Sequence, residues 1–392
     1  MARVTRYAFL VSPSHNRVYA QAAPRLALAE LSAVAERAFD GRLTDVGTTT
    51  LGGLPYVTFA LDDAPAGPDA ATVEATDLAL VSTLSSVYAL FRVEGGRDDA
   101  GEAVLRPVAR AGVDLFDSDL LTVQKYAGKT NEDFTRLLVN VTVAATDRPR
   151  DLAGPWTTRP DGARRRLRVL DPMAGRGTTL NQALVRGWDA AGIDVDAKDV
   201  EAYAVFLRTW LKNHRLKHGA SLQTQHRDGK SLGRRFAATV GATPAEYRAG
   251  ETIGVELVNA DTVRAAELFP AGHFDAIVTD APYGVQHGNR ASGTRGRDGR
   301  STSRDELTRS PVPLLSRALP GWVRLLRRGG TVGIAWNVKV APRRDLVDAL
   351  TDAGLEVLGG GRDDAAPDPW QGFEHRVDQA IQRDLVVARK PR

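Results

Sequence analysis

The chain has 392 residues, of which 43% are hydrophobic and 26% charged, with a formal net charge of +4 and a pI near 9.3. This composition is typical of a globular protein and excludes wholesale disorder, and the length predicts two domains. Cysteine is absent, which excludes disulfides, thiolate metal sites and a cysteine nucleophile, and favours a reducing compartment.

The hydrophobic runs, the histidine spacing and the pI bear on the location and partners of the protein. No apolar run approaches the roughly 20 residues that a membrane helix needs, and the opening "MARVTRYAFLVSPSH" turns polar too soon for a signal peptide. We therefore expect a cytoplasmic protein without membrane contact. The histidines lack zincin-like spacing, so we expect no metal. The high pI makes a polyanionic partner plausible. The oligomeric state stays open, with a monomer expected.

Residues 1–95 are predicted to form a small α+β domain of RNA-binding type. "YAFLVS" and "PYVTFAL" have the pattern of strands, "RLALAELSAVAERAF" that of an amphipathic helix, and "LALVSTLSSVYALFRV" that of a helix running into a strand. Residues 96–165 read as a linker. It contains one helix, "TNEDFTRLLVNVTVAA", with Thr130 or Asn131 as its cap.

Residues 166–392 alternate between strand and helix patterns. The strands are "LRVLD", "WDAAGID", "VELVNAD", "DAIVTD", "TVGIAW" and "QRDLVVAR", and helices are predicted from Thr178, from Asp199, before "RRGG" and at "RRDLVDALTDAG". Such alternation predicts an α/β fold with a Rossmann-like, doubly wound, mostly parallel sheet. Ligands of such sheets bind at the carboxyl ends of the strands.

The first strand of this region leads into a glycine loop, "DPMAGRGTT". Asp171 ends the strand, and Gly175 and Gly177 allow the backbone to turn sharply and to approach a ligand closely. A dinucleotide fingerprint would need a third glycine at position 180, which is Leu, so the dehydrogenase interpretation is weakened. Taken alone, the glycine turn is explained equally well by packing.

Two further acids follow strands. Asp194 ends "GID" about 20 residues after the glycine loop, where an acid can accept hydrogen bonds from ribose hydroxyls. Asp196 or Asp199 is a candidate for the lesser role of helix cap. Asp261 ends "VELVNAD" and is placed to reach an adenine edge, although a turn acid explains it as well.

The motif "DAIVTDAPYG" carries the strongest chemical signal. The strand is continuously apolar and therefore interior, so Asp280 emerges at its carboxyl end beside the glycine loop. An Asp, two residues and an aromatic at this place suit methylation of an exocyclic amine, a poor nucleophile. Asp280 and the carbonyl of Ala281 can accept its N–H groups, Pro282 keeps Ala281 extended, and Tyr283 can stack on the base.

Together "DPMAGRGTT", "GIDVD" and "DAPYG" resemble the motifs of class I S-adenosylmethionine-dependent amino-methyltransferases. The resemblance implies a donor along Asp171, Gly175 and Gly177, its ribose on Asp194 and its adenine near Asp261. With "STLSSVYALF", "KYAGKTNEDFTRLLVNV" and "HRVDQAIQRDLVVARK", the chain most resembles the tRNA guanosine-10 N2-methyltransferase family. That family implies N2-methylation of a tRNA guanine. Its THUMP RNA-binding domain is reduced or absent here, since only residues 94–123 separate the corresponding motifs.

Two basic segments are candidates for nucleic-acid contact. Residues 206–236 contain eight lysines and arginines and a single acid, Asp228. The loop after the catalytic motif, "GNRASGTRGRDGRSTSR", is rich in glycine, serine and arginine, which suit phosphate contact by a cationic flap beside a base pocket. Its candidate substrate-binding residues are Arg290, Arg295, Arg297 and Arg300.

The predicted activity is thus methyl transfer from S-adenosylmethionine to an exocyclic amine of an RNA base, with tRNA as the partner. The catalytic motif also serves DNA adenine or cytosine amino-methyltransferases, and only the N-terminal resemblance favours RNA. Methylation of a protein glutamine amide uses a related motif, but the cationic flap argues against it. A non-catalytic RNA-binding module that retains a donor pocket is the alternative from another class.

Overall fold

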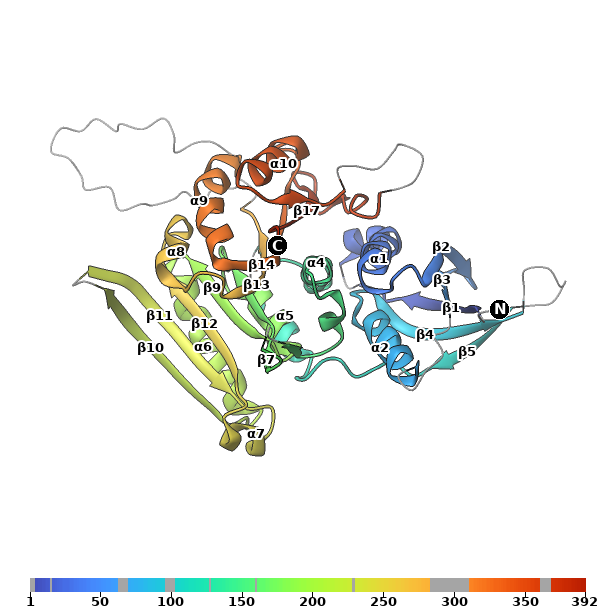
Figure 1. Ribbon diagram of the computed structural model, residues 1–392, viewed down its shortest axis with the longest axis horizontal. Coiled ribbons are helices and arrows are strands. Elements are labelled where there is room, and N and C mark those ends of the chain that lie inside the picture. The colour runs from blue at the N-terminus through green and yellow to red at the C-terminus, as the bar shows by residue number, and fades with distance from the viewer. Residues whose placement is uncertain are drawn as a thin grey trace.

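The N-terminal part of the chain is an antiparallel sheet with two helices packed on one face (Figure 1). The computed structural model describes residues 4–14, 16–62, 70–95, 103–126, 128–158, 161–227, 230–282, 310–359 and 368–392. The sheet order is β2 (Leu43–Leu51), β3 (Leu54–Asp62), β1 (Val4–Val11), β4 (Val87–Glu94) and β5 (Val104–Val108). The helices are α1 (Arg17–Ala38) and α2 (Ala70–Thr83).

Alternation along the strands explains this packing. Tyr7 and Phe9 of β1 and Phe59 of β3 are buried on one face, where they meet Leu26 of α1 and Leu80 of α2. The predicted strands and helices of this part are confirmed. Strand β2 was not predicted, and β5 extends the sheet into the segment that the sequence assigns to the linker.

The connecting segment packs against both halves of the chain. It contains α3 (Asp119–Thr122), α4 (Glu132–Ala144), the 3-10 helix η1 (Pro149–Ala153) and the short pair β6 (Trp156–Thr158) and β7 (Arg164–Arg166). Buried Glu30 of α1 accepts hydrogen bonds from Asn140 of α4 at 2.7 Å and from the Ser85 amide at 3.0 Å. Burial raises the pKa of Glu30. Since α1 and α4 share this buried network and one apolar core, the N-terminal sheet is docked on the second half of the chain.

A large, mostly parallel sheet forms the rest of the molecule. In sheet order its strands are β10 (His218–Arg227), β11 (Lys230–Val240), β12 (Ile253–Asn259), β9 (Asp189–Asp194), β8 (Arg168–Asp171), β13 (Phe274–Asp280), β14 (Leu326–Asn337), β17 (Gln382–Arg389) and β15 (Glu356–Val357), with β16 (His375–Arg376) paired to β17. Strands β12, β9, β8, β13 and β14 run parallel, whereas β17 is antiparallel to β14. The predicted Rossmann-like, doubly wound α/β sheet is confirmed.

Helices cover both faces of this sheet. Its helices are α5 (Thr178–Val185), α6 (Ala197–Asn213), α7 (Pro244–Ala249), η2 (Thr262–Arg264), α8 (Ala265–Leu268), α9 (Val312–Leu325) and α10 (Arg343–Asp352). Val169 of β8 faces the core that α4, α5 and α6 share with the N-terminal part, and Leu170 faces the core beneath α8, α9 and α10. Neighbouring residues of one strand thus enter two cores, as the apolar strand pattern predicts.

An antiparallel hairpin extends the sheet beyond β12. The sequence shows residues 206–236 as a basic interruption, and the structure forms β10 and β11 from its second half. Within that hairpin, Arg234 pairs with Glu201 of α6 and Arg235 with Glu256 of β12. These arginines therefore have acidic partners that lie outside the segment, which the local charge count could not reveal.

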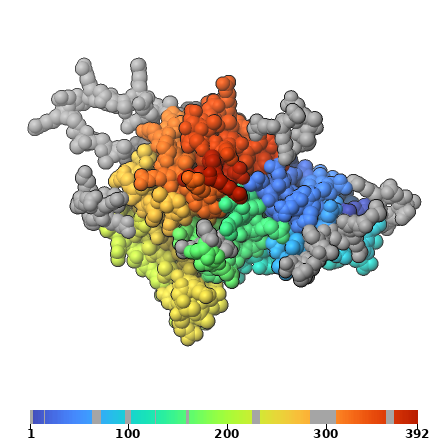
Figure 2. Space-filling view, in the orientation of Figure 1, coloured from blue at the N-terminus to red at the C-terminus, as the bar shows by residue number. Residues whose placement is uncertain are grey.

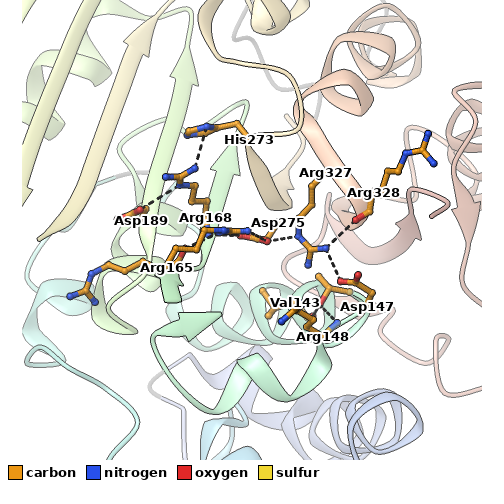
Figure 3. Close-up of polar contacts among 12 residues, drawn as sticks. Val143, Asp147, Arg148, Arg165, Arg168, Asp189, His273, Asp275, Arg327 and Arg328 are labelled. Carbon is orange, nitrogen blue, oxygen red and sulfur yellow. Dashed lines mark hydrogen bonds and ion pairs between the residues drawn. The ribbon is translucent and has the colours of Figure 1, made fainter. Parts of the chain in front are cut away.

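A buried ion-pair network fixes the amino ends of the strands, opposite the candidate site (Figure 3). Asp275 of β13 is 1% exposed and accepts two hydrogen bonds from Arg165, at 2.6 and 2.7 Å. Arg327 donates to the same carboxylate and pairs with Asp147 at 2.7 Å, while the Arg168 amide donates to Asp275 at 2.8 Å. The network therefore ties β7, β8, β13 and β14 to the end of α4.

Candidate active site

Three acids end three adjacent parallel strands at one edge of the sheet. Asp171 ends β8, Asp194 ends β9 and Asp280 ends β13. After β8 the chain builds outward through β9 and β12, and it then returns to the other side of β8 with β13 and β14. Strand β8 is therefore the topological switch point, where doubly wound sheets bind their ligands.

The two loop positions call for glycine for different reasons. Gly177 has φ of +79°, and a Cβ there would lie 2.4 Å from the ring of Tyr203, so packing against α6 excludes a side chain. Gly175 has φ of +50°, and a Cβ there would meet no atom within 4 Å. The backbone at Gly175 thus borders open space in which a ligand can approach it closely. Helix α5 begins at this loop without a side-chain cap on its first amides.

Asp171 is buried and braces the loop. Its Oδ1 accepts hydrogen bonds from the Met173 amide at 3.0 Å and from the Thr279 hydroxyl at 2.8 Å, and Thr179 also donates to the carboxylate. Burial raises the pKa of Asp171 to about 6, against the effect of these donors. Because Thr279 precedes Asp280, Asp171 connects the glycine loop to the end of β13.

Asp194 meets the glycine loop directly. Its Oδ2 accepts from the Gly175 amide at 2.7 Å and its Oδ1 from the Asp196 amide at 2.8 Å. Burial raises the pKa of this half-buried carboxyl group. Asp196 is the cap of α6 that the sequence offered as one of two candidates. The structure therefore brings together Asp194 and Gly175, two residues that the sequence assigned to one ligand.

Asp261 follows β12, the strand next to β9. Its Oδ1 accepts from the Val263 amide at 2.9 Å and caps the 3-10 helix η2, while the residue itself stays exposed. This is the turn role that the sequence left as an equal alternative. Asn259, which the sequence did not single out, donates to the carbonyls of Asp194 and Val195 at 3.0 and 2.9 Å. It fixes the turn that presents Asp194.

Asp280 is held by two residues from distant parts of the chain. Its Oδ2 accepts from the Thr130 hydroxyl at 2.8 Å and lies 3.4 Å from the guanidinium of buried Arg383 on β17. The guanidinium of Arg383 also stacks on Phe134 of α4, 4.4 Å from the ring centroid. Ala281 is buried, and its amide donates to the Ala335 carbonyl at 2.8 Å, which continues β13 along β14.

Among the remaining candidate residues of this motif and the loop after it, the structure describes only Pro282. Pro282 is exposed at the end of the described strand. Tyr283, the predicted stacking residue, lies outside the described residues, as do Arg290, Arg295, Arg297 and Arg300 of the predicted flap.

The segment before α4 spans both halves of the site, which sequence spacing did not indicate. The Tyr126 hydroxyl lies 3.0 Å from the Thr178 hydroxyl in the first turn of α5, and Arg176 of the glycine loop stacks on the Tyr126 ring. A few residues later Thr130 contacts Asp280, and Asn131 is the cap of α4. The sequence gives "KYAGKTNEDF" a helix cap and a place in the resemblance, but nothing local in it points to β13.

Among the residues that the structure describes, no three His, Cys, Asp or Glu side chains gather as metal ligands would. No helix in the same residues is long and apolar enough to cross a membrane.

No protein-family model matches this sequence, and no curated protein does. Solved structures do resemble the fold. One is a TehB-like SAM-dependent methyltransferase from Corynebacterium glutamicum, at 14% identity and a TM-score of 0.30, over 57% of this chain and 80% of that one. The [4+2]-cyclase SpnF matches at 18% identity and 0.34, over 66% and 81%. The T. thermophilus 16S rRNA N2 G1207 methyltransferase RsmC matches at 14% and 0.27, over 60% and 37%. At these values the similarities leave the substrate of this chain open.

Proposed function

We propose that the protein transfers a methyl group from S-adenosylmethionine to an exocyclic amine of a nucleobase in RNA, with guanine N2 of tRNA as its substrate. The observation that carries the proposal is the pairing of two sites across β8. On one side Asp194 binds the glycine loop, and on the other Thr130 and Arg383 hold Asp280 at the end of β13.

The donor side fits an adenosine-containing ligand. The open space at Gly175 admits a ligand against the backbone, and the Asp194 carboxylate beside it suits hydrogen bonding to ribose hydroxyls. Asp171 and Gly177 shape this loop from within, and Asp261, exposed after the neighbouring strand, is the proposed contact for adenine. When bound, S-adenosylmethionine supplies an electrophilic methyl group.

The acceptor side fits a weakly nucleophilic amine. Asp280 accepts an N–H of the amine and stabilises the positive charge that develops on nitrogen. Thr130 and Arg383 both contact Oδ2, so the carboxylate is held in a single orientation before the substrate arrives. We assign Asp280 the role of orienting hydrogen-bond acceptor. The Ala281 carbonyl is the proposed second acceptor, Pro282 limits its conformations, and Tyr283 is the proposed stacking platform for the base.

RNA is favoured as the substrate by the N-terminal part of the chain. The motif "KYAGKTNEDF", which resembles the tRNA methyltransferase family, supplies Thr130 to the proposed catalytic carboxylate. The N-terminal sheet is docked beside that motif through α1 and α4. Arg290, Arg295, Arg297 and Arg300 remain the proposed phosphate contacts after the catalytic motif.

Calorimetric titration tests the donor assignment. Wild-type protein should bind S-adenosylmethionine saturably, with about one site per chain, and should give no saturable heat with NADH, because the third glycine of a dinucleotide fingerprint is missing. Binding of NADH without binding of S-adenosylmethionine would contradict the proposal.

A further inference from the structure

A cationic pocket lies where the N-terminal helix α1 meets the last strands of the catalytic sheet. These segments are far apart in sequence and lie in contact, which Figure 2 shows as blue atoms against red. The pocket has a volume of about 380 Å³. Its lining residues are Val18, Gln21, Ala22, Arg25, His375 and Arg376.

The charge of this pocket is not neutralised by its own lining. Arg25 and Arg376 are both exposed, no lining residue is acidic, and in the described ranges neither arginine forms an ion pair. Arg25 donates to the carbonyls of Gly372 and Glu374, which fix its guanidinium without cancelling its charge. Arg376 donates to the Asp378 carbonyl at 3.1 Å.

The nearby carboxylates have other partners. Glu374 accepts a hydrogen bond from Gln382, and Asp378 accepts from the amides of Ala380 and Ile381, both at 2.7 Å. Hydrogen bonds from these neutral donors hold the two carboxylates without cancelling their charge, but neither carboxylate lines the pocket. Both guanidinium groups do line it, and two guanidinium groups at a concave surface suit phosphate oxygens.

His375 forms the buried wall of the pocket. Its Nδ1 lies 2.9 Å from the Phe373 carbonyl and donates to it, and burial together with the charges of Arg383 and Arg25 lowers the pKa of His375 to about 4. The ring is thus neutral at physiological pH, and it packs between Tyr19 and Phe134. The positive charge of the pocket comes from the two arginines alone.

A short series of contacts joins this pocket to the proposed catalytic carboxylate. The His375 ring centroid lies 5.0 Å from that of Phe134, Arg383 stacks on the same Phe134 ring, and Arg383 lies 3.4 Å from Asp280. Strand β16 pairs His375 with Arg383 of β17, so the pocket lies at the same edge of the sheet as Asp280.

We propose that this pocket binds a backbone phosphate of the nucleic-acid substrate and so sets the register of the chain that enters the active site. This inference rests on the proposed function, and it assigns to the junction of α1 and β16 a positioning role that contributes no base contact. Phosphate contacts of this kind give affinity that depends on salt.

Fluorescence anisotropy with a labelled, unmodified tRNA transcript tests the assignment. Arg376→Gln should weaken tRNA binding about tenfold near 100 mM salt and lower the salt slope by about one, because one phosphate contact is lost. The matched control is Arg344→Gln, which replaces an exposed arginine of α10 and removes the same charge. This variant should bind tRNA like the wild type. Equal tRNA affinity in the two variants would overturn the inference.

Two further measurements distinguish a failure of this inference from a failure of the proposed function. Both variants should bind S-adenosylmethionine like the wild type. A loss of tRNA affinity confined to Arg376→Gln, in a protein that binds no donor, would support the pocket and contradict the proposed function. Pyrophosphate is the probe for a free phosphate compound. Saturable binding of pyrophosphate to the wild type, lost in Arg376→Gln and with tRNA affinity unchanged, would overturn the nucleic-acid assignment.

Discussion

The guanidinium of Arg383 on β17 lies 3.4 Å from Oδ2 of Asp280 at the end of β13. Strand β17 is antiparallel to its neighbour β14, so its beginning lies at the same edge of the sheet as the carboxyl ends of the parallel strands. The reversed direction of β17 thereby brings a buried cation to the proposed catalytic carboxylate. Thr130, which precedes α4, donates a hydrogen bond to the same oxygen. The segment before α4, the end of β13 and the start of β17 therefore meet at this carboxylate.

Thr130 should affect turnover more than donor binding. Thr130→Val removes the hydroxyl that donates to Asp280, so we expect kcat to fall about tenfold or more with the S-adenosylmethionine Kd unchanged. Thr130→Ser keeps the donor and should restore most of the rate. Single-turnover methyl transfer and calorimetry measure the two quantities. Equal losses in the serine and valine variants would show that packing, and not the hydrogen bond, is important.

Asp194, unlike Thr130, should affect donor binding more than turnover. Asp194→Ala removes the carboxylate that binds the Gly175 amide, so donor affinity should fall by about 2 kcal/mol, or roughly thirtyfold. Asp261→Ala is the comparison, because that carboxylate caps η2 and is exposed; we expect a smaller loss. Calorimetric titration with S-adenosylmethionine measures both. Unchanged affinity in Asp194→Ala would remove this residue from the donor site.

Asp275 should determine stability and its loss in acid. Asp275→Asn leaves two arginines beside a neutral group and should lower the free energy of unfolding by about 3–5 kcal/mol. Burial raises the pKa of Asp275, but Arg165 and Arg327 outweigh it and hold the pKa below the usual value. The stabilisation is therefore present above the unfolded-state pKa and is lost as the pH falls through the folded-state pKa. Urea unfolding between neutral pH and the acid range measures it; a pH-independent difference between variant and wild type would contradict this account.

Asp171 should affect the pH dependence of stability in the opposite direction to Asp275. Its pKa is raised to about 6 by burial, so its contribution to stability is complete below the unfolded-state value and is lost as the pH rises towards 6. The shift corresponds to about 3 kcal/mol at most. Asp171→Asn should therefore gain stability relative to the wild type as the pH rises from about 4 to about 7. Urea unfolding at both limits tests this, and a relative stability that stays constant would contradict it.

The local patterns of the sequence predicted most of the large, mostly parallel sheet. The apolar strands, the glycine turn at Gly177 and the cap at Asn131 all depend on neighbouring residues, and the structure confirms them. The helix before "RRGG" is confirmed too, although "RRGG" itself begins β14. Strands β2 and β10 were missed because their threonine, glycine and polar residues do not give the apolar alternation of a half-buried strand.

The site required tertiary information that no local pattern carries. The sequence indicates Thr130 only as a candidate helix cap and places Arg383 in an ordinary strand pattern, yet both residues contact Asp280. Their meeting depends on the order of the strands and on the antiparallel direction of β17. In the case of Asp261, sequence alone could not decide between ligand contact and turn, because an aspartate after a strand serves both; the structure forms the cap.

The most direct test of the central claim is incubation of the purified protein with methyl-labelled S-adenosylmethionine and, separately, unmodified tRNA, genomic DNA and a protein extract, followed by nucleoside analysis. We predict label in N2-methylguanosine of tRNA, and a loss of that label by a factor of about 100 or more in Asp280→Ala with donor affinity retained. Label in DNA or protein alone would contradict the RNA assignment, and undiminished label in Asp280→Ala would contradict the assigned role of Asp280.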